Sequence, residues 1–131
     1  MATRNTRTFS DLDLSFIAKP STKDIYKKLD ENAIKQSVKN LVMTSHYERP
    51  FHPEIGSPVM ALLFENEGPM LQAMLQRAIT QVIENFEPRV RLLSVKVFSN
   101  IDNNAVDVSI TFTIINTTAP VTVDFTLQRT R

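Results

Sequence analysis

Apolar positions recur at helical spacing through the first two thirds of the chain. One stripe, at steps of four, three and one, predicts a helix over residues 30–44 and consists of Ile34, Val38, Leu41 and Val42. A broader stripe predicts a helix over residues 69–86, about 27 Å long; its members are Met70, Leu71, Met74, Leu75, Ala78, Ile79, Val82, Ile83 and Phe86. Gly68-Pro69 begins this helix and Pro88 ends it.

Between these two helices the chain is rich in proline and turn-forming residues. Residues 45–58 contain Pro50, Pro53, Gly56 and Pro58, which predicts a rigid, irregular connection. Ser57 followed by Pro58 is typical of an N-cap and a first helical position. We therefore expect a short helix over residues 58–64.

After Pro88 the hydrophobic period changes from 3.6 to 2. Three alternating runs follow, interrupted at residues 99–104 and 116–120; they are Leu93, Val95 and Val97, then Val106, Val108, Ile110, Phe112 and Ile114, then Val121, Val123, Phe125 and Leu127. Such runs separated by turn formers predict a three-stranded antiparallel meander. The fold class is thus α+β, with a small body of three helices followed by the sheet.

The predicted domain covers residues 24–131 and follows an N-terminal arm, residues 1–23. Alternation of Leu12, Leu14 and Phe16 in the arm is compatible with a short strand or with an arm that orders only on a partner. The last two strands, residues 105–129, could form a hairpin of about 35 Å. Periodicity leaves open whether this hairpin projects and pairs with another chain or covers the long helix.

Composition removes several chemistries from consideration. The 131 residues include no Cys, no Trp and two Gly, with a net charge of +1. A disulfide scaffold, a thiolate metal site, a cysteine nucleophile and a glycine-rich phosphate loop are excluded. No apolar run approaches the roughly 20 residues of a membrane span, and no signal peptide is evident. Basic residues exceed acidic ones up to Thr44, but no nucleic-acid-binding signature accompanies them, so we expect neither nucleic acid nor membrane as a partner.

Catalytic and metal-binding candidates are weak. His46 and His52 are six residues apart across the proline-rich segment and match no common metal spacing, so we expect no metal and no cofactor. A glycosidase needs two suitably placed carboxylates, whose separation is invisible in a sequence. The candidates would be Glu48, Glu54, Glu65 and Glu87.

Glu87-Pro88-Arg89 is the most distinctive short constellation. Pro88 extends Glu87, so residues 87 and 89 can project to the same side at the end of the long helix. One interpretation is an internal ion pair that seals the junction between helix and sheet. The other is a socket of both charge signs for a partner protein. From the residues alone, the sealed junction is favoured.

Four ordered motifs together resemble a known family. They are Glu48-Arg49-Pro50-Phe51, Pro53-Glu54-Ile55-Gly56-Ser57, Leu62-Leu63-Phe64-Glu65-Asn66 and Glu87-Pro88-Arg89. The set resembles the baseplate wedge proteins of contractile phage tails and the TssE component of type VI secretion systems, over roughly residues 24–129. In length the chain is similar to the T4-like phage members. It departs from the family at His52, where the pattern usually has Asp.

The resemblance implies a non-enzymatic assembly protein of the virion tail baseplate, assembled in the host cytoplasm. Glu87, Pro88 and Arg89 would contact the helical core bundle of the wedge, which favours the socket. The hairpin strand with Val121, Val123, Phe125 and Leu127 would receive strands of the first sheath ring, which favours projection. Expected partners are other wedge proteins, the tail sheath and tail tube or hub proteins, with several copies in a sixfold ring. A peptidoglycan-cleaving, lysozyme-like hydrolase remains the alternative.

The resemblance also singles out a loop motif between the first two helices. Its residues here are Arg49, Pro50, Phe51, Pro53, Glu54 and Gly56. The family pattern implies that they belong to the site residues but assigns them no partner.

Overall fold

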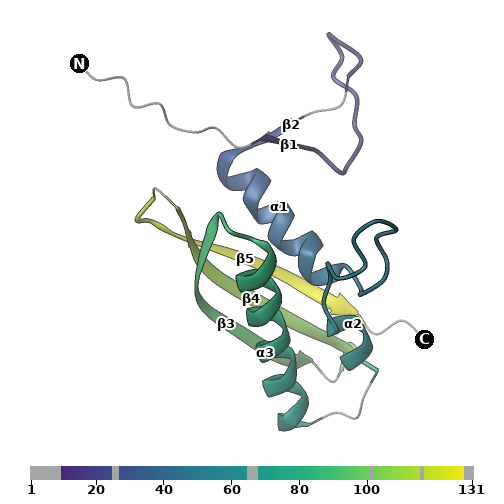
Figure 1. Ribbon diagram of the computed structural model, residues 1–131, viewed down its shortest axis with the longest axis vertical. Helices are drawn as coiled ribbons and strands as arrows, with labels where there is room; N and C mark the ends of the chain where they lie inside the picture. Colours follow the sequence, from purple (N-terminus) through teal and green to yellow (C-terminus); the bar gives the residue numbers. More distant parts are fainter. Residues whose placement is uncertain (1–9, 25–26, 65–67, 101, 116, 129–131) are drawn as a thin grey trace.

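The computed structural model describes residues 10–24, 27–64, 68–100, 102–115 and 117–128. The elements are β1 (Ser10–Leu12), β2 (Lys27–Leu29), α1 (Asp30–Met43), α2 (Val59–Leu62), α3 (Pro69–Phe86), β3 (Val90–Asn100), β4 (Ala105–Ile114) and β5 (Pro120–Gln128). A three-stranded antiparallel sheet of order β3-β4-β5 packs its apolar face against the helices, and β1 pairs with β2 near the start of α1 (Figure 1). The predicted α+β class is confirmed.

Helix α3 is the central element of the helical layer. Gly68 is its N-cap and Pro69 its first residue, while the chain leaves helical geometry at Glu87, just before Pro88. Its buried positions are Leu71, Leu75, Ala78, Ile79, Val82 and Ile83. The predicted apolar stripe is too wide at its start, because Met70 is 73% exposed and Met74 is also exposed.

Strand β3 departs from simple alternation. Its pairing with β4 shifts between Leu92 and Ser94, so that Leu93 is an extra, bulged residue. Leu93 is 54% exposed, whereas Val95 is buried. The prediction that Leu93 shares a face with Val95 was wrong, because the bulge turns residue 93 to the other side of the sheet.

Strands β4 and β5 pair without irregularity from Ala105–Gln128 to Thr113–Pro120. The inward side chains of both strands, Val106, Val108, Ile110, Phe112, Val121, Val123, Phe125 and Leu127, join one core with α1 and α3. In the single chain the apolar face of this hairpin is therefore covered along its length. Whether the hairpin also contacts a partner stays a prediction, and Arg129 at its end lies outside the described residues.

Two local predictions near the helices have different outcomes. Helix α1 buries Ile34, Val38 and Val42 as its stripe predicts. Ser57, however, does not cap α2: that helix has no side-chain cap, and the Ser57 hydroxyl instead donates to the carbonyl oxygen of Val42 at 2.6 Å. The short helix is also shorter than predicted. Among the described helices, none is long and apolar enough to cross a membrane.

The N-terminal arm contains a strand whose partner is not local. Leu12 pairs with Lys27 across β1 and β2, and the Gln36 side-chain amide of α1 donates to the Leu12 carbonyl oxygen at 2.7 Å. Leu12 and Phe16 remain exposed. The arm thus contains a short strand, but it ends at Leu12, and the expected continuation through Leu14 and Phe16 was wrong, because the chain turns there and the Phe16 N–H donates to the Asp13 carbonyl oxygen. Residues 1–9 lie outside the described part of the chain.

Candidate functional site

The Glu-Pro-Arg junction, residues 87–89, joins the end of α3 to the start of β3. Arg89 donates from Nε to Glu87 Oε1 at 2.7 Å and from Nη2 to Oε2 at 3.0 Å. The Ser37 hydroxyl of α1 donates to the same Oε2 at 2.6 Å. Glu87 is only 4% exposed and the Arg89 side chain 24%. The predicted internal ion pair therefore exists, and a second helix braces it.

The electrostatics keep this pair charged. Burial alone would raise the pKa of Glu87, but the hydrogen bonds from Arg89 and Ser37, with the Arg89 charge, outweigh it and lower the pKa. The hydrogen bond to Glu87 likewise raises the pKa of Arg89, and the charge of Asp11 in β1 adds to this. Glu87 and Arg89 thus stabilise each other's charged forms.

Ser37 is a residue of the junction that the sequence did not reveal. It lies on α1, 50 residues before Glu87, and no local pattern connects the two positions. A signal was nevertheless present. Position 37 follows Ile34 by three residues and precedes Leu41 by four, so Ser37 is a polar residue on the apolar stripe of α1. A polar side chain there needs a buried partner.

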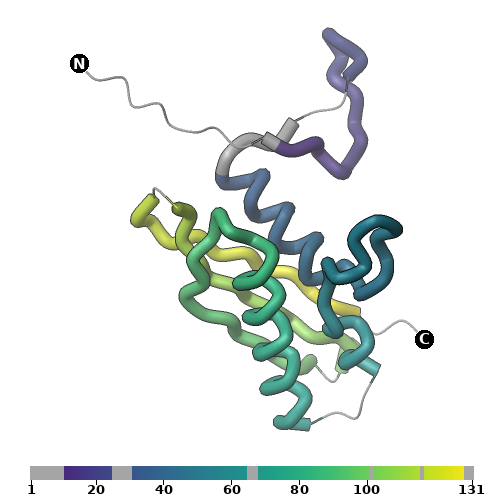
Figure 2. The backbone as a smooth tube through the Cα atoms, in the orientation of Figure 1, coloured from purple at the N-terminus to yellow at the C-terminus, as the bar shows by residue number. Residues whose placement is uncertain are grey.

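The proline loop, residues 44–58, connects α1 to α2 and stands out beside the end of α1 (Figure 2). At its base, Ser45 and Ser57 form an isolated parallel bridge, and the Ser57 N–H donates to the Thr44 carbonyl oxygen at 2.8 Å. Gly56 lies at this crossing with φ of 149°, and a Cβ there would lie 2.7 Å from the carbonyl carbon and oxygen of Ser45. Only glycine allows the two backbones to approach so closely.

The other predicted loop residues lie above this base. Phe51 and Arg49 are exposed, and Glu54 contacts His52, with 3.3 Å between Oε1 and Nδ1. A backbone hydrogen bond and His52 lower the pKa of Glu54. Where the family pattern has Asp, His52 thus pairs with a carboxylate of the same loop. The proline loop lies between α1 and α2, whereas the Glu-Pro-Arg junction lies between α3 and β3, so the structure gives two candidate surfaces.

The four predicted strand-addition residues of β5 point into the core. Val121, Val123, Phe125 and Leu127 are all buried, so a partner strand would not meet their side chains. It would meet the main chain of β5, which is an edge strand of the sheet. On the solvent face, the Thr122 and Thr111 hydroxyls lie 3.3 Å apart and Thr126 donates to Asp107 at 2.7 Å.

The hydrogen-bonding direction of β5 follows from the register. The Ile115 N–H donates to the Arg89 carbonyl oxygen, so the backbone groups of residue 115 point toward β3. The backbone groups of every second residue of β4 do the same. The backbone groups of Phe112 therefore point toward β5, where Phe112 pairs with Val121. The backbone groups of the intervening β5 residues consequently point away from β4, toward the open edge; these residues are Thr122, Asp124, Thr126 and Gln128.

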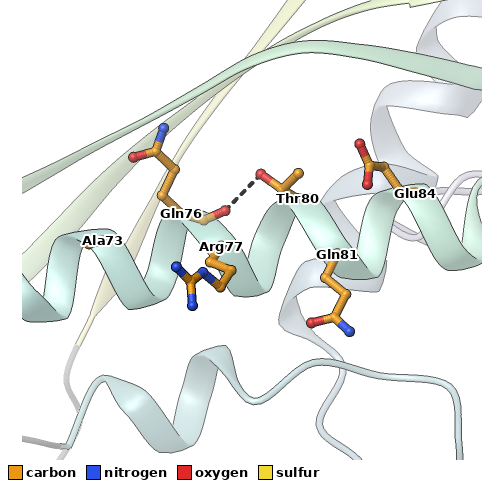
Figure 3. A pocket seen from close by; sticks show the side chains of 6 residues that line it. All are labelled: Ala73, Gln76, Arg77, Thr80, Gln81 and Glu84. Atoms are coloured by element: carbon orange, nitrogen blue, oxygen red, sulfur yellow. Dashed lines mark hydrogen bonds between the residues drawn. The ribbon is translucent and has the colours of Figure 1, made fainter.

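A shallow depression of about 450 Å³ lies along the exposed side of α3. Figure 3 shows Arg77 and Gln81 on one side of the helix and Thr80 and Glu84 on the other, with Thr80 hydrogen-bonded to the Gln76 carbonyl oxygen. No two acidic groups converge there. Within the described ranges, no three His, Cys, Asp or Glu side chains come together as a metal site would require.

The candidate catalytic carboxylates are dispersed or occupied. Glu48 accepts a hydrogen bond from the Ser45 N–H at 2.8 Å, Glu54 contacts His52, and Glu87 is held by Arg89 and Ser37. Glu65 lies outside the described residues. A general acid needs a raised pKa, whereas the pKa values of Glu54 and Glu87 are lowered.

The fold recurs in solved structures. A subunit of the anti-feeding prophage baseplate superposes with a TM-score of 0.73 at 23% identity, covering 85% of this chain and 89% of that one. A Geobacter sulfurreducens protein described as a tail lysozyme superposes with a TM-score of 0.71 at 18% identity, covering 77% of this chain and 92% of that one. At these identities the likeness concerns the fold.

Comparison with known proteins shows which class of protein this chain is and to which family it belongs. The baseplate wedge protein gp25 of Enterobacteria phage T4 is 32% identical over 110 residues, covering 84% of this chain and 83% of that protein. The class is therefore a structural protein of a phage tail baseplate. Within that class, the chain belongs to the family of baseplate wedge protein gp25, whose model matches residues 28–119. The resemblance drawn from the four motifs is confirmed, and the chain's location is the tail baseplate of the virion.

Proposed function

We propose that this baseplate wedge protein joins two parts of the tail without catalysing a reaction. Its Glu-Pro-Arg junction docks onto the helical core bundle of the wedge, and the main chain of β5 receives strands from the first ring of sheath subunits. Tail tube or hub proteins are further partners, and copies stand in a sixfold ring. Membership of the gp25 family supports the baseplate setting, and the geometry of the junction and of β5 supports the two surfaces.

The main support for the proposal is a structural difference between the two edge strands of the sheet, β3 and β5. Strand β3 has a bulge at Leu93 and exposed Arg91 and Lys96, features that protect an edge against added strands. Strand β5 pairs regularly over nine residues, with no Lys or Arg among them. Since strand addition depends on regular, unpaired main-chain groups, β5 is the edge suited to receive a partner.

The geometry of the Glu-Pro-Arg junction supports its docking onto the core bundle of the wedge. Two guanidinium nitrogens of Arg89 are fixed on Glu87, which holds the remaining, partly exposed part of the group in a defined orientation. A prepositioned guanidinium loses little freedom on binding. The internal ion pair and the socket for a partner are therefore compatible, because the ion pair fixes the orientation of the groups that form the socket.

Substitution with proline tests strand addition. Asp124→Pro removes an N–H that points to the open edge, so the β4–β5 pairing should persist. We expect the isolated chain to fold, as seen by circular dichroism, and tails that receive it to carry baseplates without sheath. Asp124→Asn, which keeps the N–H, should support normal sheath. Normal sheath growth on Asp124→Pro baseplates would refute the proposal.

A conservative exchange tests docking separately. Arg89→Lys keeps the positive charge but loses the paired geometry toward a partner. We expect a folded chain that enters wedge complexes at least about tenfold less, because interface arginines commonly dominate binding. Arg91→Lys on β3, outside the junction, is the matched control. Equal incorporation of both variants would remove the junction from the docking surface.

A further inference from the structure

The proline loop exposes two aromatic side chains, of which Tyr47 has one edge-to-face contact, with the neighbouring His46 ring. Phe51 is 90% exposed and Tyr47 84%, more than any other large apolar side chain in the described ranges. Isolated exposed apolar residues need no explanation, but two aromatic rings on one ordered loop are the type of residue that anchors interfaces. Neither ring contributes to the Glu-Pro-Arg junction or to the edge of β5.

The loop is held in shape before any partner binds. The Tyr47 N–H donates to the Pro53 carbonyl oxygen at 3.0 Å, and the Ile55 N–H donates to the His52 carbonyl oxygen at 3.1 Å. Tyr47 itself has a φ of 67°, a left-handed conformation unusual for a bulky residue. Strain of this kind persists only where surrounding contacts impose it, and it concentrates at ligand-binding segments. A preordered loop loses little entropy on docking.

The charges of the loop indicate the chemistry of its partner. Glu48 is engaged by the Ser45 N–H, and Glu54 by His52. Arg49 is exposed and forms no ion pair with any described residue. The loop therefore offers aromatic rings beside a guanidinium that pairs with neither of the loop's carboxylates. A complementary surface has an apolar pocket with carboxylates at its rim.

This chain does not itself present such a pocket along α3. The depression there has no large apolar side chain in its lining and only one carboxylate, that of Glu84, and Arg77 also lines it (Figure 3). This depression therefore offers no seat for Phe51 of a neighbouring copy, which favours a different protein as the occupant.

We propose that the proline loop is a third docking element, which inserts Phe51, flanked by Tyr47, into an apolar pocket rimmed by carboxylates on another baseplate protein. Arg49 pairs with that rim. This contact is additional to the Glu-Pro-Arg junction and to the β5 edge. It gives a role to the loop motif, which belongs to neither of those two surfaces.

The test uses the full-length chain in baseplates. Phe51→Ala should melt as the unaltered chain does, because the ring is exposed, yet enter baseplates at least about tenfold less. Phe98→Ala, which removes a ring 59% exposed on β3, should be incorporated normally. Phe51→Trp should restore incorporation. Arg49→Glu should lower it in the same way, and Arg49→Lys should lower it less. Normal incorporation of Phe51→Ala would overturn the proposal.

A photoreactive benzoylphenylalanine at position 51 then identifies the surface contacted. In assembled baseplates we expect crosslinks to another baseplate protein at an apolar segment next to Asp or Glu residues. Crosslinks to a second copy of this chain, or incorporation with no crosslink, would contradict the proposal. Arg89→Lys and Asp124→Pro retain Phe51, so failure of this proposal is distinguishable from failure of the other two surfaces.

Discussion

Gly56→Ala is the substitution whose cost the structure defines best. The backbone at Gly56 has φ of 149°, a conformation that costs other residues about 1–3 kcal/mol. The new Cβ would also lie 2.7 Å from the Ser45 carbonyl carbon and oxygen and 2.9 Å from the His46 nitrogen. Backbone atoms cannot yield cheaply, so the bridge between Ser45 and Ser57 must open, at about 0.5–1.5 kcal/mol for each hydrogen bond lost.

The expected loss is therefore about 3 kcal/mol, which for a chain of this length lowers the Tm by roughly 10–15 °C. Gly68→Ala is the matched control: φ is 159°, but a Cβ there meets no atom within 4 Å. Thermal and urea unfolding followed by circular dichroism should show Gly56→Ala to be at least about 1 kcal/mol less stable than Gly68→Ala. Equal stability of the two variants would refute the close-approach argument.

Three further substitutions probe the junction and the core. Ser37→Ala removes a donor to the Glu87 carboxylate and should lower the free energy of unfolding by about 1–2 kcal/mol in urea titrations. Because the pKa of Glu87 is lowered on folding, its contribution is present above its ordinary pKa and disappears as the pH falls through the folded-state value. The stability difference between the unaltered chain and Glu87→Gln should thus be constant from about pH 7 to 5 and shrink below about pH 4; a difference independent of pH would contradict this. Leu75→Ala, at a fully buried position, should cost about 2–5 kcal/mol in the same titrations, and a loss below 1 kcal/mol would contradict the packing described.

Elements set by local signals could be predicted from the sequence. Helix α3 begins at Gly68-Pro69 and ends before Pro88 because proline fixes the backbone at both places. The alternation in β4 and β5 predicted both strands within one residue of their bounds. These features depend on neighbours in the chain, so one sequence contains the information.

Features that depend on distant contacts were not predictable in the same way. In β3 the inward side chains follow one alternation up to Leu92 and another from Val95 onward, and the bulge at Leu93 separates the two. The position of this bulge depends on the pairing with β4, which the sequence of β3 does not contain. Ser57 has the composition of an N-cap but donates to α1 instead. Ser37 reaches Glu87 only because α1 packs against α3. In the candidate site, residues 87–89 were found, but the helix that braces them was not.

Hydrogen exchange at the open edge of β5 tests the central claim most directly. The amides of Thr122, Asp124 and Thr126 point away from β4, while those of Val121, Val123 and Phe125 point toward it. In the isolated chain the first set should exchange fast and the second slowly. In sheathed tails the first set should become protected, by at least about tenfold, because sheath strands accept these N–H groups. Unchanged exchange of Thr122, Asp124 and Thr126 between the isolated chain and sheathed tails would contradict strand addition at β5.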